Sequence, residues 1–485
     1  METLNDLLVT STDAFWQFLL IPVLAGLSLY FTVRLAGVQI RMVPDMVRQL
    51  RGTPETAPDG KKAISPFQAF SISAAARVGT GNIVGVAGAI AVGGPGAVFW
   101  MWIMALLVGS ASFVESTLAQ LYKVRDATGF RGGPAYYMQH GLGARWMGVV
   151  FAVLITVTFG FVFNAVQSNT ISGAVANSVE VAGASAPGWL APAVGVALVA
   201  VTALVVFGGV RRIAHVTQGL VPFMALLYIL MALLVVVLNA DQIGPVFTLI
   251  FESAFGLREV AGAALWTVII QGVRRGMFSN EAGLGSAPNA GATASVSHPV
   301  KQGLVQTLGV YFDTLVICTM TAFLILVSNP VYGEERGPEM TQDALQAGLG
   351  AWSVHALTFV LLLLCFSSVL GNYYYGEANV RFLSQKKGVM AGFQVVFLIA
   401  TFLGSIGQVA LVWSLADTTM GLMALVNLLA IAPLGGVAVR LLRDYRDQSS
   451  RGADPVFTRD RVPGITGIQC WEGEEDARED AAARS

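Results

Sequence analysis

The amino-acid sequence predicts an all-α polytopic membrane protein of about eleven transmembrane helices, and three observations support this fold class. Of its 485 residues, 55% are hydrophobic and only 12% are charged, whereas a soluble protein is usually about 25% charged. Many apolar segments reach the roughly 20 residues that a helix needs to cross a bilayer. Two of these segments, 67–93 and 260–288, are interrupted near mid-depth by glycines and polar residues.

The expected spans cover the whole chain except its C-terminal tail. They are 13–34, 67–93, 95–122, 146–177, 188–207, 213–238, 260–288, 301–328, 352–380, 390–412 and 416–441. Segments that follow the odd-numbered spans carry most of the Lys and Arg residues between spans, whereas the loop from Glu334 to Asp343 is net acidic. The positive-inside rule then places the N-terminus outside and the C-terminus in the cytoplasm.

The second span has a centre that is poorly suited to a helix. Gly79, Thr80, Gly81 and Asn82 lie there, and each glycine costs up to about 1 kcal/mol relative to Ala. Unpaired backbone at membrane depth is tolerated only where it is buried in protein or lines a polar cavity. Freed N–H groups after such a break can hold a carboxylate, and freed carbonyls before it can hold a cation. The alternative is that these glycines only permit close helix packing.

The seventh span repeats this feature between Gln271 and Pro288, where glycines and charged residues again lie near mid-depth. The two interrupted spans are five apart, so each one opens a five-helix unit. An odd number of helices forces the two units into opposite orientations. This arrangement is the inverted-repeat plan of secondary transporters, with a binding site at the midplane between the breaks.

The breaks divide the chain into four expected parts, because the first span stands outside the repeats. The parts are an extra N-terminal helix with a cytoplasmic loop at 1–64, the first repeat at 65–240, the inverted second repeat at 241–445 and a charged cytoplasmic tail at 446–485. The polar composition of the tail predicts disorder.

Composition and residue placement argue against several other functions. The net charge of -1 gives no reason to expect a nucleic-acid partner. Three cysteines are too few and too scattered for a disulfide framework or a zinc site. No enzyme is predicted, because His140, His215 and His298 fall at loops or helix ends, and His355 and the two cysteines within spans have no paired base or ligand cluster nearby. A passive channel usually needs several identical subunits or a continuous polar lining. This chain instead has two internal repeats with broken helices, which argues for alternating access and against a channel.

Four motifs give the chain a specific resemblance to a known family. Residues 93–102 read G-G-P-G-A-V-F-W-M-W and residues 275–288 read R-G-M-F-S-N-E-A-G-L-G-S-A-P, with shorter matches at 132–138 and 421–427. With these motifs the chain resembles the alanine or glycine:cation symporter family over nearly all of its membrane domain. The resemblance implies a sodium- or proton-coupled importer of small neutral amino acids. It also implies the inverted-repeat fold of the leucine-transporter type, with a broken first helix in each repeat.

The resemblance further implies where the substrate carboxylate binds. The break at Gly79 resembles the unwound first helix of that fold. The N–H groups of Thr80, Gly81 and Asn82 would then hold the carboxylate, and glycine allows a close approach.

Side chains from the fourth and seventh spans are expected to complete the pocket. Gln167 resembles a family pocket residue, and its amide can donate to a carboxylate or accept from an ammonium. The neighbouring Asn164 and Asn169 are equally suited to polar contacts between helices. Met277 and Phe278 would wall the side-chain pocket, although such a pair also packs in ordinary cores.

Two further features concern the substrate ammonium and side chain. Backbone around Gly272 and Gly276 would accept from the ammonium group. In the ninth span, many members of the family have a tryptophan where this chain has Asn372. A smaller, polar residue enlarges and polarises the pocket, so a substrate larger or more polar than alanine is an alternative.

The coupling ion is expected at the first break. In the likened fold, carbonyls before the break and paired hydroxyls on a later helix bind sodium, which maps to Ala75, Val78, Ser367 and Ser368. Ordinary hydrogen bonding between helices is the alternative for these serines. A proton route needs a titratable group at the site, where Arg77 is the only charged residue that the sequence places. Sodium is therefore favoured, and no other cofactor is expected.

Ionisable residues in or near spans are functional candidates by default. They are Arg77, Glu115, Arg274, Arg275, Glu281, Asp313 and Glu377. These residues either form gate pairs that break during transport or neutralise one another permanently. Glu281 has a further role open to it, because a carboxylate suits the exposed N–H groups that follow a break.

Together these features predict a symporter that imports a small neutral amino acid, similar to alanine or glycine, with sodium or a proton by alternating access. A larger or more polar amino acid as substrate, or a non-transporting membrane sensor, is the alternative. The expected partners are the amino acid, sodium and the lipid bilayer, with a single chain as the transport unit. The resemblance places the protein in the plasma (inner) membrane of a bacterium.

Overall fold

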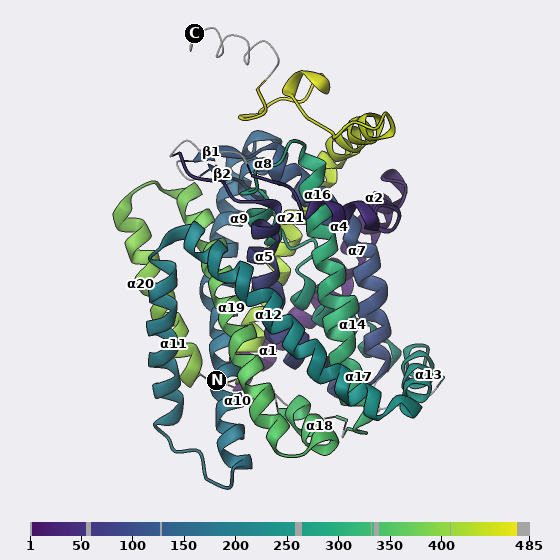
Figure 1. Ribbon diagram of the computed structural model, residues 1–485, viewed down its shortest axis with the longest axis vertical. Coiled ribbons are helices and arrows are strands. Elements are labelled where there is room, and N and C mark those ends of the chain that lie inside the picture. Colours follow the sequence, from purple (N-terminus) through teal and green to yellow (C-terminus); the bar gives the residue numbers. More distant parts are fainter. Residues whose placement is uncertain are drawn as a thin grey trace.

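The computed structural model of the chain is a bundle of helices with one two-stranded hairpin among the described residues (Figure 1). It describes residues 2–54, 60–126, 129–257, 264–330, 332–333, 339–407 and 409–472. Strands β1 (Val124–Asp126) and β2 (Gly129–Arg131) pair antiparallel. They lie at the end of the bundle that also carries α8 and residues 451–472 (Figure 1), and this end is called the tail face below.

The helices of the first half run from the N-terminus to residue 238. They are α1 (Glu2–Phe15), η1 (Trp16–Leu20), α2 (Ile21–Arg34), α3 (Val38–Arg41), α4 (Val43–Gln49), α5 (Pro66–Arg77), η2 (Gly81–Gly85), α6 (Val86–Gly93), α7 (Gly96–Leu121), α8 (Pro134–His140), α9 (Arg145–Val157), η3 (Thr158–Phe163), α10 (Asn164–Val181), α11 (Leu190–Val206) and α12 (Gly209–Leu238).

The second half begins with a short 3-10 helix and includes the longest helix, α21, which only the short η6 follows. Its helices are η4 (Ala240–Gln242), α13 (Ile243–Ala254), α14 (Leu265–Asn280), α15 (Ala287–Gly291), α16 (Pro299–Tyr311), η5 (Phe312–Cys318), α17 (Thr319–Val327), α18 (Glu339–Leu349), α19 (Trp352–Leu383), α20 (Lys387–Ile406), α21 (Val409–Ser450) and η6 (Arg459–Arg461).

The structure is that of a multi-pass membrane protein. In the described part of the chain, eight helices are long and apolar enough to cross a membrane, and the bent pair of α5 and η2–α6 raises the number to nine. Two of the predicted spans fall short, because α11 has 17 residues and α14 has 16. The start of the predicted seventh span, 260–263, lies outside the described residues. The total of eleven spans therefore stays a prediction.

The second span is broken at the predicted residues. Its first half, α5, starts with a capping box in which Ser65 and Gln68 exchange side-chain-to-backbone hydrogen bonds. This half ends at Arg77, and helical structure resumes at Gly81 with a bend of 50° between the halves. The glycine-rich sequence thus interrupts the helix as its low helix propensity predicts.

The seventh span is broken inside the predicted interval from Gln271 to Pro288, but only after the first two glycines of that interval. Helix α14 continues through Gly272 and Gly276 and ends at Asn280, and Glu281 then takes a left-handed backbone conformation with φ 57°. A Cβ atom at Gly272 would lie 2.4 Å from the carbonyl oxygen of Ala97 on α7. The backbone at these two glycines is therefore helical and not unwound as expected, and Gly272 permits close packing of α14 on α7.

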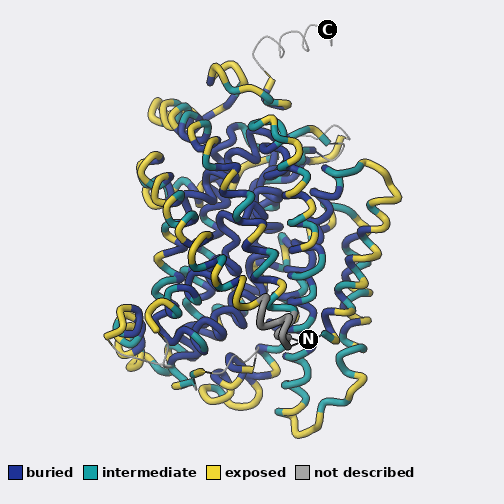
Figure 2. Tube along the Cα trace, turned by 180° about the vertical axis from the view of Figure 1, so that it is seen from behind, coloured by how far each residue is buried: buried dark blue, intermediate teal, exposed yellow. Residues whose placement is uncertain are grey.

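Burial separates an inner group of helices from an outer one. Buried residues concentrate in the middle of the bundle, whereas the outer helices carry exposed positions along their length (Figure 2). Large apolar side chains such as Leu204, Phe207 and Val237 are exposed on these outer helices, as expected for a surface that faces lipid.

The tail differs from the predicted disordered segment. Helix α21 continues to Ser450, and the residues that follow pack on the tail face up to Glu472. Phe457, Cys470 and Trp471 are buried there, so a few apolar side chains anchor a segment that is polar by composition. Residues 473–485 lie outside the described residues.

Candidate functional site

At the first break, neutral side chains bind two of the backbone N–H groups, whereas the N–H of Asn82 donates to the carbonyl oxygen of Gly79 at 3.3 Å. The N–H of Gly79 donates to Oδ1 of Asn82 at 2.9 Å, and the N–H of Thr80 donates to Oε1 of Gln167 at 3.2 Å. The hydroxyl of Thr80 also donates to Oε1 of Gln167. The structure therefore brings Gln167 of α10 to the break, together with the predicted residues Gly79, Thr80 and Asn82.

Phe278 and Gly81 lie in contact, which joins the two broken helices. A Cβ atom at Gly81 would lie 3.0 Å from the Phe278 ring, so glycine allows this approach. The Phe278 ring also packs on Phe163 and Trp413, with ring centroids 4.6 and 4.8 Å apart. Met277 is buried in the same apolar core. Phe278 thus forms one wall beside the first break.

The two serines of α19 lie against the end of α5. The hydroxyl of Ser367 is 3.4 Å from the carbonyl oxygen of Ala75 and also donates to its own helix. A Cβ atom at Gly79 would lie only 2.1 Å from the hydroxyl oxygen of Ser368. Val78 is the first residue after α5. The oxygen-bearing residues that the resemblance implied for sodium are therefore neighbours in the fold.

Asp313 connects the two broken helices, and the sequence did not place it there. Its Oδ1 accepts from Nδ2 of Asn82 at 2.6 Å, and its Oδ2 accepts from the hydroxyls of Ser279 at 2.7 Å and Thr314 at 3.0 Å. Asp313 and these partners are buried. Arg77 is therefore not the only ionisable residue near the first break, because Asn82 brings a carboxylate to it.

The second break is held by a carboxylate from α7. Oε1 of Glu115 accepts from the N–H of Gly283 at 3.1 Å, and its Oε2 accepts from the N–H of Gly285 at 3.1 Å. Oε2 also accepts from Nδ2 of Asn427 at 2.7 Å. Glu281, which was open to this capping role, instead accepts from the hydroxyl of Ser286 at 2.7 Å. Glu115 is thus the residue that caps the second break.

The arginines of α14 form ion pairs with two other spans. Arg275 donates to both carboxylate oxygens of Asp417, at 3.0 and 3.1 Å. Arg274 donates to Asp13 at 2.6 Å and lies 3.6 Å from Asp417. The guanidinium of Arg275 also lies 4.9 Å from the centre of the Trp413 ring. These pairs join α14 to α1 and α21 about one turn before Phe278.

Two further ionisable residues, Arg77 and Glu377, have partners on a neighbouring span and on the same helix, respectively. Nη1 of Arg77 donates to the carbonyl oxygen of Gln306 at 3.1 Å, and Glu377 pairs with Arg381 one helical turn away at 2.7 Å. Asn164 donates to Thr401 of α20 at 2.7 Å. Arg77 and Asn164 thus contact neighbouring spans, as polar residues between membrane helices often do.

This fold and site define a class of protein, a multi-pass membrane transporter whose broken helices meet around buried polar groups. The chain belongs to the sodium:alanine symporter family, whose family model matches residues 1–459. The family is one of transporters, and amino-acid and cation symport is its activity.

Two relatives and one solved structure are similar to this chain. The chain is 50% identical to the "Probable sodium/glutamine symporter GlnT" of Bacillus subtilis (strain 168), over 97% of this chain and 96% of the relative. It is 38% identical to the "Sodium/alanine symporter AgcS" of Methanococcus maripaludis, over 91% and 97%. The crystal structure of MhsT in complex with L-phenylalanine matches with a TM-score of 0.56 and 14% identity, over 78% of this chain and 97% of MhsT. The last likeness shows the transporter fold.

Proposed function

We propose that the chain imports a neutral amino acid together with sodium by alternating access. The observation that best supports the carboxylate site is that the N–H groups of Gly79 and Thr80 donate to neutral oxygens, those of Asn82 and Gln167. A substrate carboxylate can replace these oxygens, because hydrogen bonds to a charged acceptor are roughly twice as strong as those between neutral groups. Gly81 lies beside Phe278, which then walls the pocket next to the carboxylate.

The substrate that we propose has a polar side chain with an amide, as glutamine has. Both amide atoms of Asn372 are buried without a hydrogen-bond partner among the described residues, and a buried unsatisfied polar group costs about 1–3 kcal/mol. Asn372 lies one helical turn after Ser368, and its neighbour Gly371 packs on Ala76 at the end of α5. A substrate carboxamide offers both an NH2 group that donates and a carbonyl oxygen that accepts, which match the two unpartnered groups of this amide. The name of the relative GlnT supports the same substrate class.

Replacement of Asn372 tests this substrate class. Purified protein in proteoliposomes with an inward sodium gradient should accumulate labelled glutamine in preference to alanine. The Asn372→Leu variant has a side chain of similar size that forms no hydrogen bonds. Its ratio of glutamine to alanine uptake should be about tenfold lower than that of the unmodified protein, which corresponds to about 1.4 kcal/mol. The Asn372→Trp variant should narrow the pocket and favour alanine or glycine. A strict preference of the unmodified protein for glycine and alanine would refute an amide-bearing substrate.

The coupling sodium is proposed to bind between α5 and α19. The carbonyl oxygens of Ala75 and Val78 and the hydroxyls of Ser367 and Ser368 are hard oxygen ligands of the kind that such cations prefer. The hydroxyl of Ser367 lies 3.4 Å from the carbonyl oxygen of Ala75, and this proximity supports the arrangement. Because the same break also carries the carboxylate site, sodium and substrate should each raise the affinity for the other.

Asp313 offers a second place for a coupling cation, either sodium or a proton. Its partners Asn82, Ser279 and Thr314 are all neutral donors, as is the more distant thiol of Cys318 at 4.0 Å. Arg77 acts on this carboxylate through space without a hydrogen bond to it in the described structure, and an ionised carboxylate at membrane depth is costly without a directly bound partner. A cation bound there would tie the end of the first break to the end of α14.

The Asp313→Asn variant tests whether this carboxylate couples transport to the cation. Sodium-driven accumulation should fall at least about tenfold, because the charge that holds the cation is lost. The Ser279→Ala variant removes only one hydroxyl and is the matched control, with a smaller effect expected. A pH gradient that drives uptake without sodium would identify a proton as the coupling ion. Sodium-dependent substrate binding that is unchanged in Asp313→Asn would place the coupling elsewhere.

The proposed orientation puts the tail face in the cytoplasm of a bacterial cell, within its plasma (inner) membrane. The Lys and Arg residues at this face support it through the positive-inside rule. Both broken helices and all residues of the proposed site belong to one chain, which supports a single chain as the transport unit. Absence of uptake of every amino acid tested would favour the non-transporting sensor instead.

A further inference from the structure

The residues that follow α21 fold back over the tail face, and residues 454–472 are called the strap here (Figure 1). The N–H of Phe457 donates to the carbonyl oxygen of Ser297 at 2.8 Å. In return, the hydroxyl of Ser297 donates to the carbonyl oxygen of Pro455 at 2.8 Å. The strap is thus hydrogen-bonded to the loop between α15 and α16, directly after the second broken helix.

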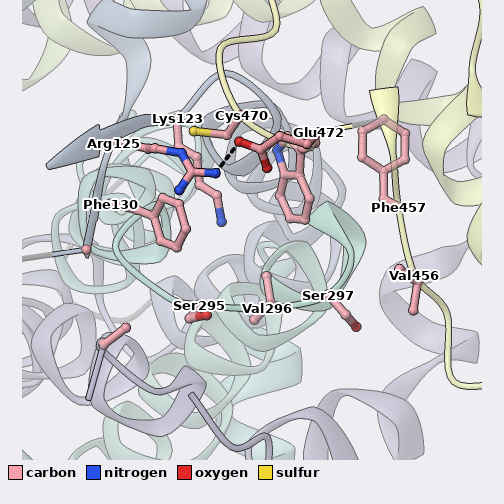
Figure 3. Close-up of a pocket in the computed structure, with 13 residues that line it drawn as sticks. Lys123, Arg125, Phe130, Ser295, Val296, Ser297, Val456, Phe457, Cys470 and Glu472 are labelled. Carbon is pink, nitrogen blue, oxygen red and sulfur yellow. Dashed lines mark hydrogen bonds and ion pairs between the residues drawn. The ribbon is translucent and has the colours of Figure 1, made fainter. Parts of the chain in front are cut away.

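The far end of the strap is anchored by Trp471. Its indole N–H donates to the carbonyl oxygen of Gln120, at the end of α7, at 3.2 Å. The Lys123 ammonium lies 4.2 Å from the centre of the Trp471 ring and 3.8 Å from that of Phe130. Lys123 and Phe130 line the same pocket as Cys470 of the strap (Figure 3).

The surface under the strap joins the ends of both broken helices. The N–H of Ser295 donates to the carbonyl oxygen of Ile64, just before α5, at 2.9 Å. The side chain of Gln120 donates to the carbonyl oxygens of Gly291 and Ala294, at the end of α15 and just beyond, at 2.6 and 2.9 Å. The strap therefore covers the place where α5, α7 and α15 meet at the tail face.

Ion pairs join the strap to α16 and α21. Asp454 pairs with Lys301 of α16 at 2.6 Å, and Arg461 pairs with Asp444 of α21 at 2.8 Å. In each pair one side chain is at least 41% exposed, so solvent weakens the attraction.

Two buried anchors and one further exposed ion pair complete these contacts. Phe457 and Trp471 are 3% and 9% exposed. The ion pair between Arg125 and Glu472 is open to solvent, with side chains 56% and 45% exposed, and such pairs contribute little. A segment held in this way can detach without unfolding of the bundle.

We propose that the strap is an autoinhibitory latch that holds the ends of the two broken helices together at the tail face. Alternating access requires these ends to separate when the site opens toward the cytoplasm. The latch must therefore detach in each cycle or loosen before transport starts. This inference rests on the proposed function, because a latch of this kind slows only a protein that opens at this face.

Truncation tests the latch through the rate of uptake. A chain that stops after Arg451 lacks the strap, and a chain that stops after Glu472 keeps it and is the matched control. The shorter chain should take up substrate severalfold faster under the same sodium gradient, whereas the control should match the full chain. The Trp471→Ala variant in the full chain should also be faster, which covers the case of a truncated chain that fails to fold. Equal rates in all four proteins would overturn the latch.

Chemical labelling of Cys470 follows detachment of the strap directly. Burial at 5% exposure raises the pKa of this thiol, so it should react slowly with a maleimide while the strap is attached. Sodium and substrate together should speed the labelling severalfold in the full chain, and Trp471→Ala should label quickly without them. The Cys470→Ser variant gives the background. Labelling that stays slow in Trp471→Ala and during uptake would also overturn the latch.

The failure of the latch can be told apart from failure of the proposed function. A full chain that transports, with a truncated chain of equal rate, refutes the latch alone. A silent full chain whose truncated form transports supports the latch. If both chains are silent with every amino acid and cation tested, the proposed function and the latch are both refuted.

Discussion

The two breaks of this protein are alike in sequence but differ in what satisfies their backbone. At the first break, the N–H groups of Gly79 and Thr80 donate to neutral side-chain oxygens. At the second, the N–H groups of Gly283 and Gly285 donate to the two oxygens of one carboxylate, that of Glu115. Glycines open both helices, yet the groups that fill the openings have different charge.

This difference indicates different uses of the same backbone feature. A break that holds neutral oxygens can exchange them for the carboxylate of a ligand, because the charged acceptor makes the stronger hydrogen bonds. At a break whose N–H groups already bind a carboxylate, replacement by the carboxylate of a ligand would make the hydrogen bonds no stronger. Asn427 also donates to Glu115, and this additional bond fixes the carboxylate in place. The first break is therefore suited to binding, and the second to joining α14 and α15 to α7.

The largest expected effect, on the free energy of unfolding, comes from removing the carboxylate that binds the second break. The Glu115→Ala variant leaves two backbone N–H groups without their acceptor, and each unsatisfied buried group costs about 1–3 kcal/mol. The free energy of unfolding should fall by roughly 2–6 kcal/mol, measured by thermal unfolding in detergent. Glu115→Gln keeps one acceptor oxygen and should lose less. If Glu115→Ala is as stable as the unmodified protein, the second break is not held by this carboxylate.

Local sequence predicted where the first helix breaks, because glycine acts on the backbone at its own position. The partners of the breaks could not be predicted in this way. Glu115 lies 168 residues from Gly283, and Asp313 lies 231 residues from Asn82. Such pairs depend on how whole helices pack, which propensity and hydropathy do not determine. Asp313 was recognised as ionisable in a span, but nothing local indicated its partners.

In the tail, the mean composition of the sequence led to a prediction of disorder that the described residues up to Glu472 do not follow. Its average composition is polar and charged, which predicts disorder. Four apolar residues, Phe457, Val462, Cys470 and Trp471, are nevertheless buried on the tail face. The mean composition of the segment does not reveal a few apolar residues that are widely spaced along it. Trp471 is the residue that could have indicated a docked segment, because a tryptophan buries a large apolar area.

The second expected effect comes from making the first break resemble the second. The Gln167→Glu variant places a carboxylate where Oε1 of Gln167 accepts from Thr80, so it should occupy the substrate site and repel the substrate. Substrate affinity, measured by calorimetry in detergent with sodium, should fall at least about 100-fold, or about 2.7 kcal/mol. Folding should be retained because the two side chains have the same shape.

The uncharged Gln167→Leu variant separates charge from loss of the hydrogen bond. It removes the acceptor without repelling the substrate, so about a tenfold loss of affinity is expected, or about 1.4 kcal/mol. If Gln167→Glu binds substrate as well as the unmodified protein, the first break does not bind a carboxylate, and the comparison between the breaks loses its functional meaning.

The smallest expected effects test the helical glycines that precede the second break. Gly272→Ala would place a Cβ atom 2.4 Å from the Ala97 carbonyl oxygen, and overpacking of this kind costs roughly 1–3 kcal/mol. At Gly276 the nearest atoms belong to Met101 at 3.6 Å, so Gly276→Ala should be neutral or gain up to about 1 kcal/mol from helix propensity. Both variants should leave substrate affinity unchanged, because these positions pack α14 on α7. Weaker substrate binding in Gly276→Ala at unchanged stability would instead return the ammonium-binding role to this backbone and make both broken helices part of the binding site.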